Sequence, residues 1–436
     1  MELHRGAGNR AVADLFRRAL QRDVGWKDAS TQGHAWNLDE RSVGKIRRIP
    51  LEGLSEGLGE NRVWDVKAKK WRVVSESPEI PVLSSESAKG KAIVLVPDGL
   101  DAKKKIEVLV FLHGFTEYGG RPYAGWRTLT DPPKGMKREE TERLKRLRQG
   151  ADPQDSAPVR DVALDQAEQQ LEESGDTQLV IVLPQGGLHS QFGKDGDQNF
   201  DAGPYVAEIV SRLLTEKRWR DAGGKPVTTA PTVSRIDMAG HSGAGATLAH
   251  MADAKQPSSA LTGDLVIYDA INRGQLSSFV TWAGKRLDAD LAVLTGTATD
   301  DQKFEYLRGA QKLRGYTTDS YISAYIELDD AIGRWFTRNR AKLGAWAPCL
   351  RANYTMEYVD VAHEELMRGS KAGQARPAGT GTILDAIKGL HPALLTSTTT
   401  CPAMPKPLSQ RFRERKLQEE RERDEQRKAA KNRKPR

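Results

Sequence analysis

The segment from Ser234 to Ala249, which reads SRIDMAGHSGAGATLA, constrains the fold of this chain more than any other. A short apolar run ends at Met238 and Ala239, a glycine-rich turn follows, and Ala, Thr and Leu then continue at helical spacing. This order predicts a strand, a sharp turn and a helix, with Ser242 at the apex of the turn. In such a turn, a nucleophile elbow, a strained backbone conformation lifts the serine hydroxyl clear of the sheet.

The elbow requires small residues two positions before and two positions after its serine, because strand and helix nearly touch there. Gly240 meets the first requirement, and Ala244 stands where the commonest pattern has glycine, so the motif is a G-x-S-x-A variant. Other glycine-rich motifs fit less well: no G-x-G-x-x-G dinucleotide fingerprint is completed, and no Gly-Lys-Ser/Thr follows as a P-loop requires. The remaining alternative is a strand–helix turn with an incidental serine.

A serine hydroxyl becomes a nucleophile when a base takes its proton and a third group fixes the tautomer of that base. His363 follows the alternating segment from Tyr354 to Val361, which predicts a strand, and it alone of the eight histidines lies downstream of the elbow at a strand end. This position favours His363 as the base over a surface histidine that caps the next helix. A zinc site is not predicted, because Met367 stands where H-E-x-x-H needs its second histidine.

Two places in the sequence offer the acid that would orient this histidine. Asp269 ends the apolar run LVIY, the first run after the elbow helix. Asp300 and Asp301 follow a run at 291–294 that we expect to be the next strand, the more usual place for this acid. A buried run that ends in aspartate without a turn motif is harder to explain structurally than a polar Thr-Asp-Asp loop. We therefore favour Asp269 and keep Asp300 and Asp301 as the alternative.

Stabilising the charge that develops during acyl transfer requires two backbone N–H groups aimed at one point. Gly243, directly after the nucleophile, would supply one of them. Phe115, in the His-Gly-Phe segment that follows an early buried run, would supply the other.

Four residues are candidates for the lining of a substrate pocket beside this site: His113, Gly114, Gln185 and His189. The alternative for the segment around Gln185 is an ordinary loop without a role in the pocket.

Strand-length apolar runs alternate with helical periodicity along most of the chain. The runs IEVLVFL at 106–112 and LVIVL at 179–183 are apolar throughout, as expected of strands buried on both faces. This alternation predicts an α/β fold with a mostly parallel sheet covered by helices on both sides. Further strands are expected at 42–51, 91–96, 265–268 and 291–294, and helices at 161–173, 205–214 and 303–346.

Four segments, VFLHGF, MAGHSGAG, VIYDAI and DVAHEEL, occur in this order and resemble the motifs of the α/β-hydrolase superfamily. The resemblance covers roughly residues 42–395. It implies a serine hydrolase that forms an acyl-enzyme, with an ester as the expected substrate and an amide or peptide bond as the second choice. Small-molecule, lipid or peptidoglycan-type substrates all fit, and no metal or organic cofactor is implied. The alternative is a binding or structural component that keeps the fold without catalysis.

Composition divides the chain into a body and two charged ends. We expect a hydrolase domain over 26–407 with inserted loops at 52–90 and 131–160, an amphipathic segment at 1–25 and a charged tail at 408–436 without an apolar face. Most of the net charge of +8 lies in that tail. The body is nearly neutral, so no nucleic-acid partner is predicted.

The first segment, LHRGAGNRAVADLFRRALQRD, resembles the GN-x-AV motif near the start of many bacterial proteins associated with extracellular contractile injection systems. The resemblance implies a cargo or delivery signal that addresses an injection-system particle through residues 1–25. The alternative is a terminal helix that docks on the body.

No apolar run approaches the ~20 residues that cross a membrane, and the chain begins without the apolar core of a secretory signal peptide. We therefore expect a cytoplasmic protein, or one exported by an injection system without a signal peptide. The two cysteines, Cys349 and Cys401, allow one bridge that the sequence does not indicate.

Overall fold

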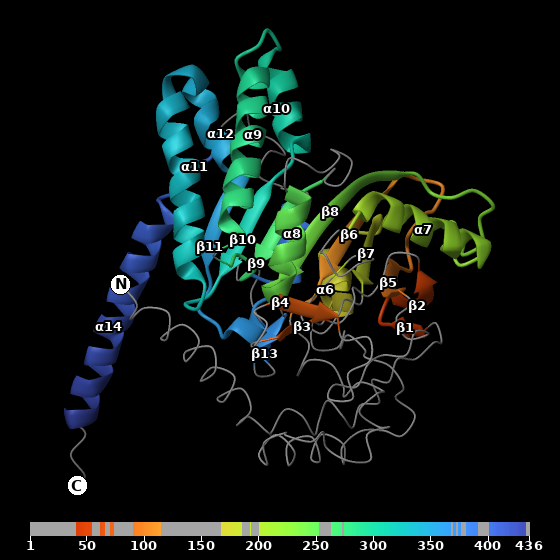
Figure 1. The fold of residues 1–436 in the computed structure, drawn as a ribbon, viewed down its shortest axis with the longest axis horizontal. Coiled ribbons are helices and arrows are strands. Elements are labelled where there is room, and N and C mark those ends of the chain that lie inside the picture. Colours follow the sequence, from red (N-terminus) through yellow and green to blue (C-terminus); the bar gives the residue numbers. More distant parts are fainter. Residues whose placement is uncertain are drawn as a thin grey trace.

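The computed structural model describes residues 41–54, 62–65, 70–73, 90–114, 167–184, 192, 200–252, 263–272, 274–367, 369–371, 374–375, 381–390 and 401–432. Within these residues the chain forms one large sheet with helices on both faces (Figure 1). The predicted insertion at 131–160 and the segment at 1–25 lie outside the described residues.

The nine-stranded sheet has the order β1-β2-β5-β7-β6-β8-β9-β10-β11. Strands from β7 through β11 in that order are mutually parallel, whereas β5 runs antiparallel to both of its neighbours, β2 and β7. One antiparallel strand near the edge, followed by two strands that exchange places, is the arrangement of the α/β-hydrolase fold, which confirms the predicted fold class. The strands are β1 (Arg41–Val43), β2 (Ile46–Leu54), β5 (Gly90–Pro97), β6 (Ile106–Leu112), β7 (Leu179–Pro184), β8 (Val233–His241), β9 (Leu265–Tyr268), β10 (Leu313–Thr317) and β11 (Tyr354–Tyr358).

In the part of the chain that the structure describes, two two-stranded antiparallel sheets lie outside this sheet, β3 (Arg62–Asp65) with β4 (Lys70–Val73) and β12 (Ser370–Lys371) with β13 (Gln374–Ala375). The first of them falls within 52–90, where the sequence predicts an inserted loop.

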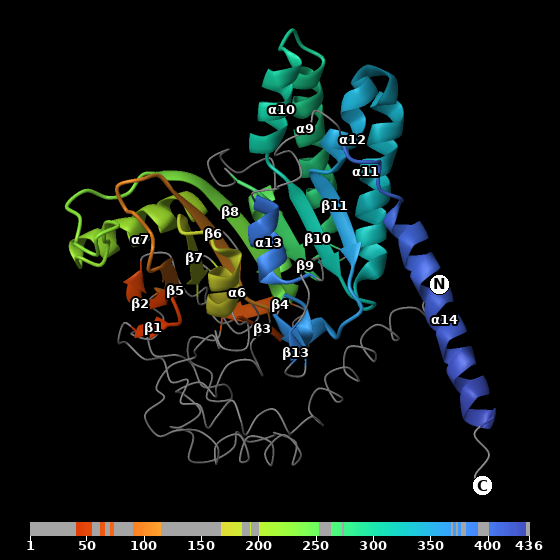
Figure 2. The ribbon, with the colours of Figure 1, turned by 180° about the vertical axis from the view of Figure 1, so that it is seen from behind.

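Helices cover the two faces of the sheet unequally. Apolar side chains of α6 (Ala167–Ser174) and α13 (Ile383–Leu390) pack on one face, seen in front of the sheet in Figure 2. The opposite face carries α7 (Ala202–Thr215), α8 (Gly245–Ala252), α9 (Leu276–Leu294) and α11 (Ile322–Leu343). The other helices among the described residues are α10 (Asp300–Gly309), α12 (Ala347–Arg351) and α14 (Leu408–Asn432), with 3-10 turns at Ser242–Ala244, Gly344–Trp346 and His363–Glu365.

Strand β6 shows why its sequence is apolar without interruption. Successive side chains of a strand point to opposite faces of the sheet. Val108 and Val110 belong to the core beneath α7 to α11, and Leu109 and Phe111 belong to the core beneath α6 and α13. A polar residue at either set of positions would be buried, so both sets are apolar.

Two sequence-based expectations about the later strands are wrong. Residues 291–294 form the last turn of α9, whose buried side chains Phe279, Trp282, Leu287 and Leu294 follow helical spacing. The strand that follows β9 in the chain is instead β10, at Leu313–Thr317, inside the segment at 303–346 that the sequence predicts to be helical. The sequence also predicts one strand at 42–51, where the structure has two, β1 and β2, joined by a turn in which Gly44 has a φ of 60°.

Gly315 explains why β10 is hard to read from sequence. A Cβ at this glycine would lie 2.3 Å from the Met356 sulfur and 2.7 Å from the Tyr325 ring. Close packing on the neighbouring β11 and on α11 therefore requires a residue with low intrinsic strand preference.

The charged end of the chain forms α14, and its first turns pack on the body, contrary to the expectation that this segment has no apolar face. Leu408 is fully buried, and its N–H donates to Asp329 over 2.8 Å. Phe412 packs edge-on against Tyr358 of β11 with ring centroids 5.0 Å apart. Beyond these turns α14 continues past the sheet as a charged rod (Figure 1).

Cys349 and Cys401 form a disulfide, which answers the pairing question that the sequence leaves open. The bridge joins α12 to the segment that leads into α14. It therefore closes a loop that contains β11 and His363, and such a covalent closure restricts the unfolded chain.

Candidate active site

Ser242 lies at the end of β8 in the conformation that the elbow motif predicts. Its φ is 53°, in the left-handed region that side chains other than glycine rarely adopt, and a 3-10 turn leads from it into α8. A Cβ on Gly240 would lie 2.8 Å from Leu248 and 3.0 Å from Cβ of Ala244. The glycine before the serine therefore makes room for the alanine after it, which is how the turn accommodates the G-x-S-x-A variant.

Asp269 directly follows β9 and is fully buried. It also has a positive φ, 45°, so a second strand end carries backbone strain beside the elbow. One carboxylate oxygen accepts the backbone N–H of Thr318 over 2.8 Å, and the other accepts the Thr318 hydroxyl over 2.6 Å. Thr318, just past β10, was missed by sequence analysis because β10 itself was missed.

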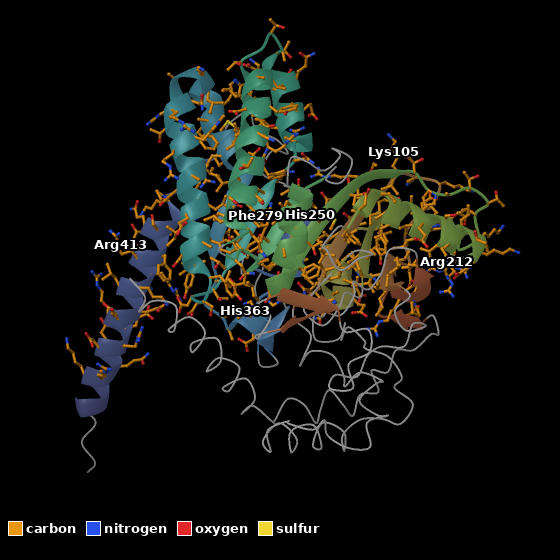
Figure 3. The ribbon with its side chains drawn as sticks, viewed as in Figure 1. Lys105, Arg212, His250, Phe279, His363 and Arg413 are labelled. Atoms are coloured by element: carbon orange, nitrogen blue, oxygen red, sulfur yellow. A yellow bond between two sulfur atoms is a disulfide. The ribbon has the colours of Figure 1, made fainter. Side chains whose placement is uncertain are left out.

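His363 stands between these two residues in a 3-10 turn after β11. Its Nδ1 lies 2.9 Å from Oδ2 of Asp269, and its Nε2 lies 2.9 Å from Oγ of Ser242. A carboxylate can only accept, so Nδ1 carries the proton and the unprotonated Nε2 accepts the serine hydroxyl. The structure thus joins the three residues in one hydrogen-bonded series, at the lower end of the sheet in the view of Figure 3, where His363 is labelled.

Backbone pairing on both sides holds the turn that carries His363. Before it, the N–H of Val359 donates to Thr317 of β10 over 2.8 Å. After it, the N–H of Met367 donates to Gly381, and the N–H of Ile383 donates back to Met367. His363 is therefore fixed between the sheet and the start of α13.

Gly114 packs directly against the elbow. A Cβ at this position would lie 2.7 Å from Nδ1 of His241 and 3.0 Å from Cβ of Ser242, so only glycine fits. The preceding residue, His113, is buried, and its Nδ1 lies 2.6 Å from the carbonyl oxygen of Gly114. This oxygen accepts, so His113 fixes the orientation of the peptide that follows Gly114. Phe115, Gln185 and His189 lie outside the described residues.

The alternative acids are not brought to this site. Asp300 and Asp301 form the first turn of α10, where the carboxylates favour the positive end of the helix and Thr299 with Gln302 forms a capping box. Figure 1 places α10 at the top of the molecule, whereas His363 lies at the opposite end of the sheet in the same view (Figure 3). Asp300 and Asp301 therefore begin a helix, and they do not follow a strand as the alternative assignment requires.

Among the described residues, no group of three or more His, Cys, Asp or Glu side chains is arranged to hold a metal ion. None of the described helices combines the length and the apolarity needed to cross a bilayer.

The sequence matches no protein-family model, and the comparison with curated proteins finds no match. Solved structures do resemble the chain. An S-formylglutathione hydrolase from Agrobacterium tumefaciens is 11% identical, with 74% of this chain and 91% of that chain covered and a TM-score of 0.30. A carboxylesterase from Geobacillus stearothermophilus is 12% identical, with 84% and 91% covered and a TM-score of 0.31.

A third solved structure, an acylaminoacyl peptidase from Pyrococcus horikoshii, is 14% identical. The match covers 78% of this chain and 47% of that chain, with a TM-score of 0.28. The names of these neighbours are those of hydrolases. At these scores the likenesses carry no argument about substrate or mechanism, and the fold rests on the strand order and directions described above.

Proposed function

We propose that this chain is a serine hydrolase that acts on esters through an acyl-enzyme, with amides or peptides as the second choice of substrate. The observation that carries the proposal is the series of 2.9 Å contacts from Ser242 to His363 and from His363 to Asp269 at a strained strand end. A serine that lies only by chance in a glycine-rich turn would not need this arrangement.

In the proposed reaction, Oγ of Ser242 attacks the substrate carbonyl carbon while Nε2 of His363 takes its proton. The carbonyl π electrons move to the oxygen, and the C–O bond of the ester then breaks as His363 returns the proton to the leaving alcohol. Asp269 holds Nδ1 protonated throughout and stabilises the imidazolium that forms. Water repeats the sequence on the acyl-enzyme and releases the acid.

The charged oxygen needs donors that are already in place. We assign this role to the backbone N–H of Gly243 and, as its partner, to that of Phe115. The close fit of Gly114 on the elbow supports the assignment, because it brings the start of the second loop against Ser242.

The test is p-nitrophenyl ester hydrolysis together with labelling by a fluorophosphonate probe. We expect Ser242→Ala to lose both while its thermal unfolding stays close to that of the wild type. An inert wild type would instead favour the alternative, a non-catalytic component that keeps the fold. Labelling that persists in Ser242→Ala would show that another residue is the nucleophile.

We further propose that residues 1–25 form a delivery signal for a contractile injection system, and that the protein acts after export. The disulfide supports a destination outside the cytoplasm, because such bonds persist mainly in oxidising compartments. The test compares the full chain with residues 26–436 in the native host. Both should hydrolyse esters equally, and only the full chain should copurify with the particle. Equal recovery of both forms would overturn the proposal.

This comparison keeps residues 408–436 in place. Leu408 and Phe412 pack on the body, so a chain ending at 407 would lose buried surface as well as charge. Loss of activity in that shorter chain would report on folding and would say nothing about delivery.

A further inference from the structure

His241 is the last residue of β8, directly before Ser242, and it has no part in the triad. Its side chain is buried. Side chains two positions apart on a strand point to the same face of the sheet, so His241 shares the face of Ala239, which belongs to the core beneath α6 and α13. The fold thereby places the imidazole of His241 against the turn that carries His363.

Two contacts join His241 to the proposed base. Its Nε2 lies 3.0 Å from the backbone carbonyl oxygen of His363, and its ring stacks on the His363 imidazole with centroids 4.6 Å apart and planes inclined by 29°. A carbonyl oxygen can only accept, so Nε2 of His241 carries a hydrogen and donates it. One side chain therefore holds both the backbone and the ring of the same residue.

The 3-10 turn itself holds this carbonyl only weakly. The N–H of Leu366 is shared between the carbonyl oxygens of Ala362, at 3.2 Å, and His363, at 3.3 Å. The second of these distances exceeds the usual range of an N–H···O bond. The bond from His241 is shorter and is not shared in this way, so it is the contact that fixes the peptide after His363.

The position of the His241 ring is in turn set by its other side. A Cβ on Gly114 would lie 2.7 Å from Nδ1 of His241, so this glycine packs directly against that atom. The same imidazole thus contacts the turn of the proposed base and the start of the loop to which the second oxyanion donor is assigned. Close packing of this kind leaves the ring little room to move.

Stacking alone would not hold the base in register. The ring of Tyr321, just before α11, also stacks on His363, with centroids 5.0 Å apart and planes inclined by 24°. Stacked rings resist tilting, but offset arrangements are also favourable, so a ring slides in its own plane at low cost. The bonds of His363 to Asp269 and Ser242 lie in that plane, because both nitrogen atoms bond there. Sliding is therefore the movement that would lengthen them, and the bond to the backbone carbonyl opposes it.

We propose that His241 is a positioning residue for His363, whose Nε2–H bond to the His363 carbonyl keeps the base within 2.9 Å of both Asp269 and Ser242. The inference rests on the proposed serine-hydrolase function and adds a residue outside its triad. In that reaction His363 takes the proton of Oγ and gives it to the leaving alcohol, so one ring has to reach two oxygen atoms. His241 exchanges no proton and contacts no reacting atom.

The experiment uses the full chain with two substitutions of His241. His241→Phe keeps a flat ring beside His363 and removes the donor, whereas His241→Gln removes the ring and keeps an N–H at a similar distance from the backbone. We expect kcat/KM of His241→Phe for p-nitrophenyl acetate to fall about 10- to 100-fold, the range that a misplacement of about 1 Å can cost. The loss should lie in kcat, with KM changed by less than about 2-fold. His241→Gln should stay within about 5-fold of the wild type, because its amide can donate to the same carbonyl.

A second substrate separates misplacement of the base from loss of folded protein. Ethoxide leaves only with a proton from His363, whereas p-nitrophenolate leaves without one. In His241→Phe the loss of kcat/KM should therefore be larger for ethyl acetate than for p-nitrophenyl acetate. The ratio of the two constants does not depend on how much of a preparation is folded, so it tests His241 even in a variant of low stability.

The matched control is His250→Gln, which replaces a half-buried histidine in the last turn of α8 (Figure 3) and should keep both constants. An active wild type with an equally active His241→Phe variant would overturn the role of His241 and leave the serine hydrolase intact. A loss that is equal for the two esters, or that His241→Gln does not restore, would show that His241 serves packing only and would overturn the inference. A wild type that neither hydrolyses the esters nor reacts with the fluorophosphonate probe would overturn both proposals.

Discussion

Two aspartates flank strand β9, and both are fully buried. Asp264, directly before the strand, accepts from the guanidinium of Arg235 and lies 3.8 Å from Nζ of Lys312. Asp269, directly after it, is bound in the described contacts by neutral donors, namely Thr318 and the Nδ1–H of His363. The carboxylate before β9 is therefore paired with cations, whereas the carboxylate after β9 is hydrogen-bonded by neutral groups and keeps its negative charge unpaired in the described contacts.

The difference fits the role that the proposed function gives to Asp269. A permanent cation beside Asp264 offsets the cost of burying its charge, which matters only for stability. A cation beside Asp269 would weaken its attraction for the imidazolium that forms on His363 during the proposed reaction. Neutral hydrogen-bond donors solvate the carboxylate without cancelling its charge.

Neighbouring strands repeat this division. The first half of β8 carries Arg235 and Asp237, joined over 2.7 Å, and Ser242 comes directly after the end of the strand. Parallel strands place all their carboxyl ends at one edge, which is where ligand sites occur in such sheets. At the opposite edge, ion pairs such as those of Arg235 with Asp237 and Asp264 join neighbouring strands.

The largest expected difference between the two ends is in catalysis. Asp269→Asn should lower kcat by up to ~10⁴-fold, because an amide stabilises the wrong imidazole tautomer. Asp264→Asn, at the other end of the same strand, should keep kcat within a few-fold for the protein that folds. Steady-state ester hydrolysis by both variants measures this, with Asp300→Asn as an exposed control. If Asp264→Asn or Asp300→Asn were the crippled variant, the assignment of the acid would be wrong.

The next largest effect is in stability. Arg235→Met removes the cation shared by Asp237 and Asp264, and breaking a buried pair in this way costs about 3–5 kcal/mol. Denaturant titration should therefore show a lower midpoint for Arg235→Met, whereas kcat of the remaining folded protein is unchanged. The control is Lys103→Met, which breaks the exposed pair between Lys103 and Asp221 and should cost less than about 1 kcal/mol. Equal losses in the two variants would show that burial does not distinguish these pairs.

The order of motifs made the candidate site at the carboxyl end of the sheet predictable from sequence. An apolar run precedes Ser242, another precedes Asp269, and an alternating run precedes His363. Each run predicts a strand, and parallel strands place their carboxyl ends side by side at one edge of the sheet. The fold class and the three residues of the hydrogen-bonded series followed from local patterns of this kind.

What could not be predicted depends on partners distant in sequence. Gly315 makes β10 hard to recognise from sequence. With that strand unrecognised, neither Thr318, which donates to Asp269, nor Tyr321, whose ring stacks on His363, could be placed at the candidate site. The charged residues at the amino ends of the strands look like ordinary polar residues in the sequence, because no local pattern indicates that Arg235 forms an ion pair with Asp264. The disulfide is similar, since Cys349 and Cys401 are 52 residues apart and only packing brings them together.

The charge cluster should also show itself in the dependence of stability on pH. Burial raises the pKa of Asp237 from 3.8 to about 6, although Arg235 acts in the opposite direction. The native state then binds a proton more tightly than the unfolded state, so this contribution to stability is full below about pH 4 and is lost as the pH rises through about 6.

The measurement is the free energy of unfolding of the wild type relative to Asp237→Asn between pH 4 and pH 7. The stability of the wild type relative to the variant should fall by about 1–3 kcal/mol as the pH rises from 4 to 7, the amount that corresponds to the raised pKa of Asp237. Asp264, whose pKa burial also raises, titrates in the same direction. A difference that is flat over the interval, or one that grows with pH, would contradict this account of the cluster.

The smallest expected effect concerns the candidate site, at the carboxyl end of β9. Thr318→Val removes the hydroxyl that donates to Asp269 over 2.6 Å but keeps the backbone N–H that donates to the other carboxylate oxygen. One hydrogen bond to a charged group then disappears, so kcat should fall about tenfold. Thr317→Val is the matched control, because its hydroxyl, in the adjacent residue, donates over 3.2 Å to the carbonyl of Thr318 and does not contact Asp269. If both variants lost kcat equally, packing at the end of β10 would explain the loss. If only Thr318→Val loses it, the carboxylate depends on neutral donors in the way that distinguishes Asp269 from Asp264.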